Sequence, residues 1–213
     1  METTFNLPRN YLSYSAFTLW KSDKTRFRNK YYLGIDTFET AETIYGKKIA
    51  KSLEDGEKIE GVEEYEKAEK SIKVELIPGL TLLGYLDGFT EDTLKIVELK
   101  TGHTNKDGKA PWDKLKVQRH KQLQYYCLLV KLKYGTYNPD VTLQWLETEF
   151  AKDTMEFDGH ILEGTTSRLE LTGRVETFDR HIEQWELDKI QEEIIEVAKE
   201  ISIDFTAYEQ GKL

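Results

Sequence analysis

The sequence GYLDGF at residues 84–89, followed by the polar turn TEDT at residues 90–93 and by KIVELKTG at residues 95–102, decides the fold. Both apolar segments are rich in Leu, Ile, Val and Phe, so they predict two strands joined as a β-hairpin. Side chains alternate between the two faces of a strand, so one face of this hairpin can lie on a core. The apolar side chains of that face are Leu82, Leu86, Val97 and Leu99.

The other face of the hairpin carries charged side chains. With the turn centred on residues 91–92, Asp87 faces Ile96, and Asp87 and Glu98 become diagonal neighbours. Such neighbours lie roughly 7–8 Å apart between Cα atoms, so two carboxylates can share a divalent cation. Lys100 follows on the same side, and burying two acids and a lysine is costly, which indicates a metal or substrate site. The simpler alternative is a structural hairpin on which the two acids form ion pairs with Lys100.

The chain has 213 residues, of which 38% are hydrophobic and 32% are charged. This composition predicts one soluble globular domain with a sizeable core. No apolar run reaches the ~18 residues of a membrane span, and the N-terminal residues show no secretory signal. The sole cysteine, Cys127, excludes an internal disulfide and a zinc or iron–sulfur site built from cysteines. We therefore expect a cytoplasmic protein with no membrane partner.

The formal net charge of −9 argues against a nucleic-acid partner, but the charge is unevenly distributed. Residues 21–30 hold five basic side chains and one acidic one, and residues 106–121 hold six and two, a net +4 in each segment. Residues 54–69 hold two against eight and residues 183–213 three against nine, a net −6 in each. An acidic body with two basic segments suits a protein that meets phosphate at one site. Each basic segment taken alone is better explained by a solvated helix face.

The remaining elements follow from periodicity and capping residues. A first helix is expected to begin at Ser13 or Ser15 and to stop near Gly34, and Gly135 is expected to end a long helix. A helix over residues 183–201 is predicted to turn inward Trp185, Ile190, Ile194, Ile195, Val197 and Ala198. The other predicted elements are a helix over 40–53, a loop with a short surface helix over 54–70, a strand over 71–76, a mobile loop over 101–112, a helix over 112–134, a strand over 141–150, and polar strands or loops over 151–179.

Three motifs in a fixed order carry a family resemblance: Gly-Tyr-Leu-Asp-Gly at residues 84–88, Ile-Val-Glu-Leu-Lys-Thr-Gly at 96–102, and Gln-x-x-x-Tyr at 122–126. Together with a preceding helix that contains Gly46, they resemble the PD-(D/E)XK nuclease superfamily. Within it the similarity is greatest to the RecB-like branch of recombination enzymes and phage exonucleases. The resemblance implies an α/β fold of the restriction-endonuclease type, with a small mixed β-sheet around a central antiparallel hairpin and with flanking helices.

The resemblance also implies how the chain is divided and what it does. A single nuclease-like domain over residues 1–213 would comprise an N-terminal helical part (1–70), a catalytic core (71–150), and C-terminal strands with a closing helix (151–213). Its implied activity is metal-dependent hydrolysis of DNA, as an exonuclease rather than an endonuclease, in phage or bacterial recombination, replication or repair. DNA is the implied partner, and a single-strand-binding or annealing protein is a candidate protein partner.

The resemblance assigns the chemistry to the hairpin. Asp87, Glu98 and the carbonyl of Leu99 would bind Mg²⁺ or Mn²⁺, not zinc. The chain lacks the cysteines that hold an iron–sulfur cluster in some relatives, so no cluster is expected. Lys100 would orient the attacking water and stabilise the charge that develops on the phosphate. The residue types suit this role, since hard cations prefer oxygen ligands and a bound cation lowers the pKa of water.

Further residues are implied to contact DNA. Gln122 and Tyr126 share a helix face one turn apart. Residues of the N-terminal segment resemble the family's Ser-x-Ser and Pro-Arg-x-Tyr segment. The DNA-binding candidates are Gln122, Tyr126, Arg26, Tyr31, Ser13 and Tyr14. Arginine and aromatic side chains suit phosphate contact and base stacking. The alternative is ordinary helix packing, and Tyr126 adjoins an apolar run that favours a core position.

One position departs from the family. A metal-binding His often stands four residues after the helix glycine, and here that position is Ala50. Glu54 and Glu42 lie on the same i, i+4 stripe and are candidates for an extra ligand. The departure leaves two alternatives to an active nuclease: a catalytically weakened DNA-binding or scaffold protein that retains the fold, and a structural protein whose acids only decorate its surface.

Overall fold

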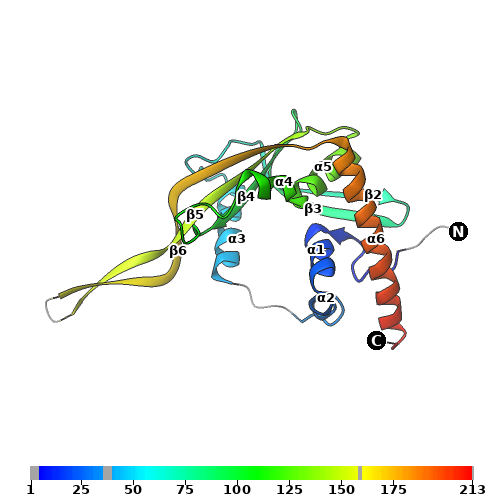
Figure 1. The fold of residues 1–213 in the computed structure, drawn as a ribbon, viewed down its shortest axis with the longest axis horizontal. Helices are drawn as coiled ribbons and strands as arrows, with labels where there is room; N and C mark the ends of the chain where they lie inside the picture. Colours follow the sequence, from blue (N-terminus) through cyan, green and yellow to red (C-terminus); the bar gives the residue numbers. More distant parts are fainter. Residues whose placement is uncertain (1–4, 36–39, 158–159, 213) are drawn as a thin grey trace.

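The computed structural model describes residues 5–35, 40–157 and 160–212, in which six strands form one mixed sheet (Figure 1). The strands are β1 (Leu12–Ser13), β2 (Lys67–Ile77), β3 (Leu80–Thr90), β4 (Lys95–Gly102), β5 (Asp140–Phe157) and β6 (His160–His181). Their order is β1-β3-β4-β5-β6, with β2 also paired to β3. The β1/β3 and β4/β5 pairs are parallel and the others are antiparallel. The predicted mixed sheet around a central antiparallel hairpin is confirmed.

Helices flank this sheet, and their ends carry the expected capping groups. They are α1 (Tyr14–Ser22), α2 (Lys24–Tyr31), α3 (Ala41–Glu54), α4 (Lys114–Arg119), α5 (Lys121–Tyr134) and α6 (Gln184–Glu209). The hydroxyl of Ser13 accepts from the first turn of α1, and the hydroxyl of Thr40 does the same for α3. Gly135 ends α5 with a φ of 78°, a left-handed conformation that glycine adopts without strain.

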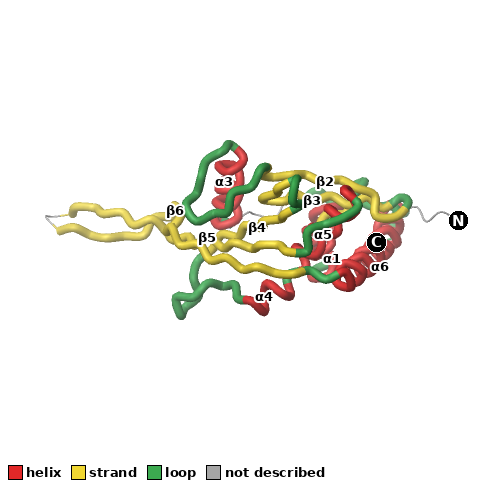
Figure 2. The backbone as a smooth tube through the Cα atoms, turned by 90° about the horizontal axis from the view of Figure 1, so that it is seen from above, coloured by secondary structure: helices red, strands yellow, loops and turns green. Residues whose placement is uncertain are grey.

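Figure 1 shows α1, α2 and α6 gathered at one end of the molecule, while β5 and β6 leave the other end as a long two-stranded ribbon. Figure 2 shows the same ribbon from above, with α3 beside the sheet near the base of the ribbon. Both ribbon strands pair with each other from Asp140↔His181 to Phe157↔His160. In the described part of the chain, no helix combines the length and the apolar character that crossing a membrane requires.

The core lies between the sheet and the helices at the end opposite the ribbon. Its largest fully buried side chains include Phe17 and Trp20 of α1, Leu86 of β3 and Tyr125 of α5. Burying such side chains supplies the main driving force for this arrangement. Helix α3 contributes one buried residue, Ile49, which lies outside this core cluster.

The register of the β3–β4 hairpin differs from the prediction. The observed pairs are Gly88↔Val97, Phe89↔Ile96 and Thr90↔Lys95, so the turn spans residues 91–94 rather than centring on 91–92. Leu94 enters the turn with a φ of 53° and packs its side chain against the core, which lengthens the turn on its C-terminal side. Continuing the observed register places Asp87 across from Glu98, not diagonal to it.

Two predicted helices are each divided in two. The N-terminal one breaks at Asp23, whose carboxylate accepts from the Arg26 N–H over 2.9 Å and so begins α2. The one predicted over 112–134 breaks between α4 and α5 at His120. There the guanidinium of Arg180 donates to the carbonyls of Val117 and His120. Each carbonyl also accepts a backbone N–H three residues on, so Arg180 adds a second donor at the break.

Other boundaries also differ from the prediction. No helix forms over the described residues 55–66, and β2 begins at Lys67, earlier than predicted. The polar residues 160–181 form one long strand, β6, because β5 pairs with them along its whole length. On α6 the predicted core residues Ile190, Ile194, Val197 and Ala198 are buried, and Ile195 is partly buried. Trp185 is wrong as a core residue, since it is 63% exposed on the first turn of the helix.

Candidate active site

The candidate site lies at a fork, the place where β3 and β4 separate beyond Gly88 and Val97. Their ladder ends at Gly88↔Val97, whereas β4 stays paired with β5 as far as Gly102. Beyond Val97, the edge of β4 that faces β3 therefore has no ladder partner, and a buried N–H group needs an acceptor. The Leu99 N–H finds one in the carboxylate of Asp87, to whose Oδ2 it donates over 2.8 Å. This hydrogen bond holds the carboxylate of Asp87, on β3, against the backbone of β4.

The second acid and the lysine meet at the same place. Glu98 is fully buried, and its Oε1 accepts a hydrogen bond and an ion pair from Nζ of Lys100. The other carboxylate oxygen, Oε2, is also buried and has no hydrogen-bond partner among the described residues. A buried carboxylate oxygen without a partner is costly, so a ligand at this oxygen would stabilise it. The predicted grouping of Asp87, Glu98 and Lys100 on one side of the hairpin is confirmed.

Burial dominates the electrostatics of these groups. Desolvation, together with the neighbouring Asp87 carboxylate, raises the pKa of Glu98 to about 8, against the opposing effect of Lys100. Desolvation likewise raises the pKa of Asp87. For Lys100 desolvation acts to lower the pKa, but the two carboxylates outweigh it and the pKa is raised. When both acids are ionised they outnumber the one ammonium group, and a bound cation would compensate this excess of negative charge.

A cavity of about 480 Å³ opens at these residues. Helix α3 forms one wall, with Glu42, Gly46 and Ala50 among its lining residues. The predicted i, i+4 stripe therefore faces the cavity over most of its length. Glu54 does not line it and pairs instead with Lys51, with 2.8 Å between Nζ and Oε2. A Cβ on Gly46 would lie 3.1 Å from Oγ1 of Thr101 on β4, so the helix approaches this side chain closely at the glycine.

The opposite wall comes from α5. Gln122 lines the cavity and accepts a hydrogen bond from Nζ of Lys100 over 3.1 Å. Its amide nitrogen donates to the hydroxyl of Tyr126 over 2.8 Å. Tyr126 is only 6% exposed, so it lies in the core and reaches the site through Gln122. This chain of hydrogen bonds fixes the direction of the Lys100 ammonium group.

The N-terminal DNA-binding candidates have separate surroundings. Among them, Tyr14 is the residue whose pKa responds to the charges of Lys100 and Glu98, and burial raises this pKa. Ser13 serves as the N-cap of α1. Arg26 is exposed on α2, and the ring of Tyr31 packs at a tilt against Phe27 with 4.6 Å between ring centroids. The structure brings Tyr14 to the site and does not bring Arg26 or Tyr31 there.

Three residues that lie near the site were not predicted from the sequence as site residues. Glu69 lines the cavity from β2, although we predicted a loop at that position. His120 and Trp112 form an aromatic cluster with Tyr14, with centroids 4.9 Å apart for Trp112–His120 and 6.4 Å for Tyr14–His120. Burial, reinforced by the charge of Lys100, lowers the pKa of His120 to about 4. The imidazole is therefore neutral near pH 7.

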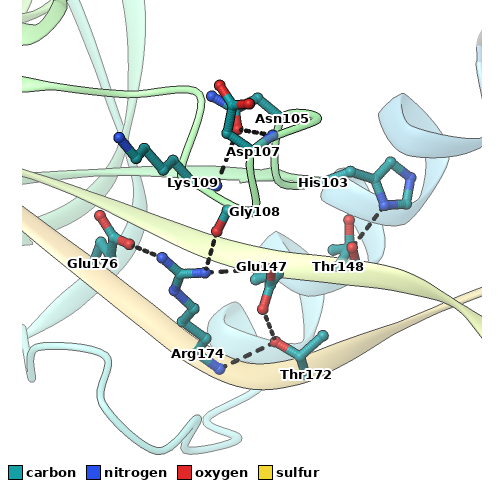
Figure 3. Close-up of polar contacts among 10 residues, drawn as sticks. All are labelled: His103, Asn105, Asp107, Gly108, Lys109, Glu147, Thr148, Thr172, Arg174 and Glu176. Atoms are coloured by element: carbon teal, nitrogen blue, oxygen red, sulfur yellow. Dashed lines mark hydrogen bonds and ion pairs between the residues drawn. The ribbon is translucent and has the colours of Figure 1, made fainter.

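The segment after β4 is held by hydrogen bonds, whereas we predicted a mobile loop (Figure 3). The side chain of Asn105 accepts from the N–H groups of Asp107 and Lys109, which closes the tip of the loop. Arg174 of β6 donates to the carbonyl of Gly108 over 3.1 Å. At the base of the loop, Nδ1 of His103 lies 2.6 Å from the carbonyl oxygen of Thr148. These contacts tie the exit of β4 to the ribbon strands.

The donor set fits a hard divalent cation. Asp87 and Glu98 supply carboxylate oxygens, and the unpartnered Oε2 of Glu98 is a vacant acceptor at the cavity. The described residues contain no group of three or more His, Cys, Asp or Glu side chains placed to hold one ion. Any cation held here would therefore complete its coordination with the backbone and with water, as Mg²⁺ commonly does.

A protein-family model agrees with the nuclease resemblance. Residues 39–212 match the family model described as the PD-(D/E)XK nuclease superfamily. No curated protein gives a match. Among solved structures, the chain is similar to an alkaline exonuclease (LHK-Exo) from Laribacter hongkongensis, with 11% identity, a TM-score of 0.44, and coverage of 95% of this chain and 93% of that chain. A structure of LHK-Exo in complex with dAMP gives 12% identity, a TM-score of 0.43, and coverage of 96% and 95%.

Proposed function

This chain belongs to the PD-(D/E)XK nuclease superfamily, and we propose that it hydrolyses DNA phosphodiesters with Mg²⁺ or Mn²⁺ as its cofactor. The observation that supports this most is the buried Glu98 carboxylate. One of its oxygens is paired with Lys100 and the other has no hydrogen-bond partner within the described part of the chain, at a cavity that Asp87 also lines. A carboxylate kept in this state is costly unless it holds a positively charged ligand.

Each residue has a role that follows from its contacts. Asp87 and Glu98 would hold the cation together with the carbonyl of Leu99, and the Leu99 N–H fixes the Asp87 carboxylate in place. A divalent cation at these oxygens would lower the pKa of a bound water and offset the charge of the phosphodiester. Lys100, directed by Glu98 and Gln122, would orient the water and stabilise the charge developing on the phosphate.

We extend the proposal to exonuclease action in phage or bacterial recombination, replication or repair, in the cytoplasm. The support for this extension is the resemblance of the three motifs to the RecB-like branch. The second candidate is a DNA-binding or scaffold protein with weakened catalysis. The observation that favours it is Ala50, which lines the cavity where the family often has a metal-binding His.

One experiment separates these candidates. End-labelled single-stranded and double-stranded DNA are incubated with the protein and Mg²⁺ or Mn²⁺, alongside EDTA and Glu98→Gln controls. We expect cation-dependent products with the wild type and none in either control, and the pattern of labelled products identifies end-dependent cleavage. DNA binding without products under every condition would support the scaffold alternative. If the protein neither binds nor cleaves DNA, both candidate functions are refuted.

A further inference from the structure

Glu69 joins the site from a strand that the proposed mechanism does not use. It lies on β2 between the paired positions Ala68↔Gly88 and Lys70↔Leu86, which places it across from Asp87 on β3. Residues directly opposite each other in an antiparallel pair are close neighbours. Glu69 also lines the cavity that Asp87 and Glu98 line. A third carboxylate therefore faces the same space as the two acids of the fork.

The backbone at Glu69 is unusual. Its φ of 48° is one of two positive values at non-glycine residues in the described part of the chain. This left-handed region favours glycine, so a glutamate there stores strain, and such strain concentrates at functional sites. The conformation interrupts the regular course of β2 where it passes Asp87. A glycine would relieve the strain but would remove the carboxylate.

The carboxylate of Glu69 has no hydrogen bond or ion pair with any described residue, and its side chain is exposed. Nearby acids on the same segment do have partners. Glu63 pairs with Lys95, Glu64 pairs with Lys58, and Glu66 accepts from the N–H of Glu91. Two acids facing each other across a ladder destabilise it when both are charged. Glu69 therefore lowers the stability of the fold in two ways: its backbone is strained, and its negative charge faces Asp87.

We infer that Glu69 positions the cation proposed at Asp87 and Glu98 by accepting a hydrogen bond from one of its bound waters. This inference rests on the proposed function. The unpartnered, fully buried Oε2 of Glu98 marks the ligand position, and Glu69 adds negative charge from β2 at the same cavity. The contact runs through water because no three acids of the described residues are placed to hold one ion directly. Glu69 would then offset the loss of the family's imidazole at Ala50.

The test measures Mn²⁺ binding to the metal-free full chain by calorimetry, which needs no cleavage. We expect Glu69→Gln and Glu69→Gly each to weaken Mn²⁺ binding by roughly tenfold, as for other outer-shell partners of metal ligands. Glu69→Gly also relieves the backbone strain, so equal losses in both variants trace to the carboxylate. Glu60→Gln is the control: it removes one charge from an exposed acid of the preceding loop that has no polar partner among the described residues. It should leave Mn²⁺ affinity unchanged.

Thermal unfolding of the metal-free variants provides the second measurement. We expect Glu69→Gln to be at least as stable as the wild type without metal, because it removes a charge that faces Asp87. Unchanged Mn²⁺ affinity in Glu69→Gln, alongside loss of binding in Glu98→Gln, would overturn the inference and leave the proposed function intact. No Mn²⁺ binding by the wild type, with Glu98→Gln behaving identically, would overturn both.

Discussion

The two helical walls of the cavity differ in how firmly they are attached to the protein. Helix α5 buries seven of its residues in the core, from Leu123 to Val130, and packs against both the sheet and α6. Helix α3 buries one, Ile49, outside the core cluster. Yet both walls face the same acids: α5 through Gln122, and α3 through Glu42, Gly46 and Ala50.

The difference in attachment suggests that α5 and α3 serve the site in two different ways. The wall that directs Lys100 is part of the core, so the proposed catalytic group is held in a fixed direction. The wall that departs from the family is attached by few buried contacts, and such elements open locally at lower free energy than the core. We therefore expect changes on α5 and at the fork to affect chemistry or global stability, and changes on α3 to affect ligand affinity.

The largest effect is expected at the fork, which neither wall supplies. Asp87→Ala and Glu98→Ala should each abolish detectable Mn²⁺ binding and lower the cleavage rate by about 10³-fold, because each removes a proposed ligand. Calorimetry and a DNA cleavage assay measure these losses, and circular dichroism checks that the fold is retained. Wild-type metal affinity in the double variant would place the metal site elsewhere.

The next largest effect is expected at Lys100, which a side chain of α5 holds in place. Lys47 of α3 provides the comparison. Lys100→Ala should retain Mn²⁺ affinity and lower the rate by about 10²-fold, since lysine acts on water and developing charge and is no ligand. Lys47→Ala removes the lysine of α3 that lines the same cavity, and it should lower the rate less. If metal affinity collapses in Lys100→Ala while the rate per bound metal is unchanged, the assigned role is wrong.

Stability should separate the walls directly. Leu129→Ala on α5 deletes a fully buried side chain and should lower the free energy of unfolding by about 2–5 kcal/mol. Ile49→Ala on α3 should cost less, because this residue lies outside the core cluster. Urea denaturation gives both values, and hydrogen exchange should show α3 amides opening before those of α5. Equal costs and equal protection would remove the distinction between the two walls.

A smaller effect is expected from restoring the family's imidazole on the weakly attached wall. Because Ala50 lines the cavity, Ala50→His should tighten Mn²⁺ binding and leave cleavage unchanged or faster. Calorimetry and thermal unfolding are used to compare this variant with the wild type. Overpacking would instead cost about 1–3 kcal/mol with no gain in affinity. That outcome would mean that position 50 does not reach the cation.

The smallest effects concern phosphate contacts away from both walls. Arg26→Gln and Lys114→Gln remove exposed charges, and each should reduce the slope of log affinity for DNA against log salt by about 0.7–0.9. Arg28→Gln is the matched comparison, because the Arg28 guanidinium pairs with Asp204 of α6. It should lower stability and leave the slope unchanged. Unchanged slopes for Arg26 and Lys114 would mean that these residues do not contact DNA.

The sequence by itself determined what depends on near neighbours along the chain. Alternation along the hairpin predicted that Asp87, Glu98 and Lys100 share one side. The i, i+4 spacing predicted that Glu42, Gly46 and Ala50 share one helix face, and all three line the cavity. The capping residues Ser13 and Gly135 predicted helix ends for the same reason. Each of these features follows from the local period of a strand or helix and from one or two side chains at its end.

Only the tertiary structure decided how distant segments meet. The register of the β3–β4 pair depends on a four-residue turn that packs Leu94 on the core, and a local pattern does not specify such packing. The separation of these strands arises because β4 continues along β5, and it leaves the Leu99 N–H to Asp87. Full burial of Glu98 and the approach of Glu69 from β2 follow from which surfaces the fold covers. Burial and long-range pairing are properties of the whole chain, so no single segment of the sequence reveals them.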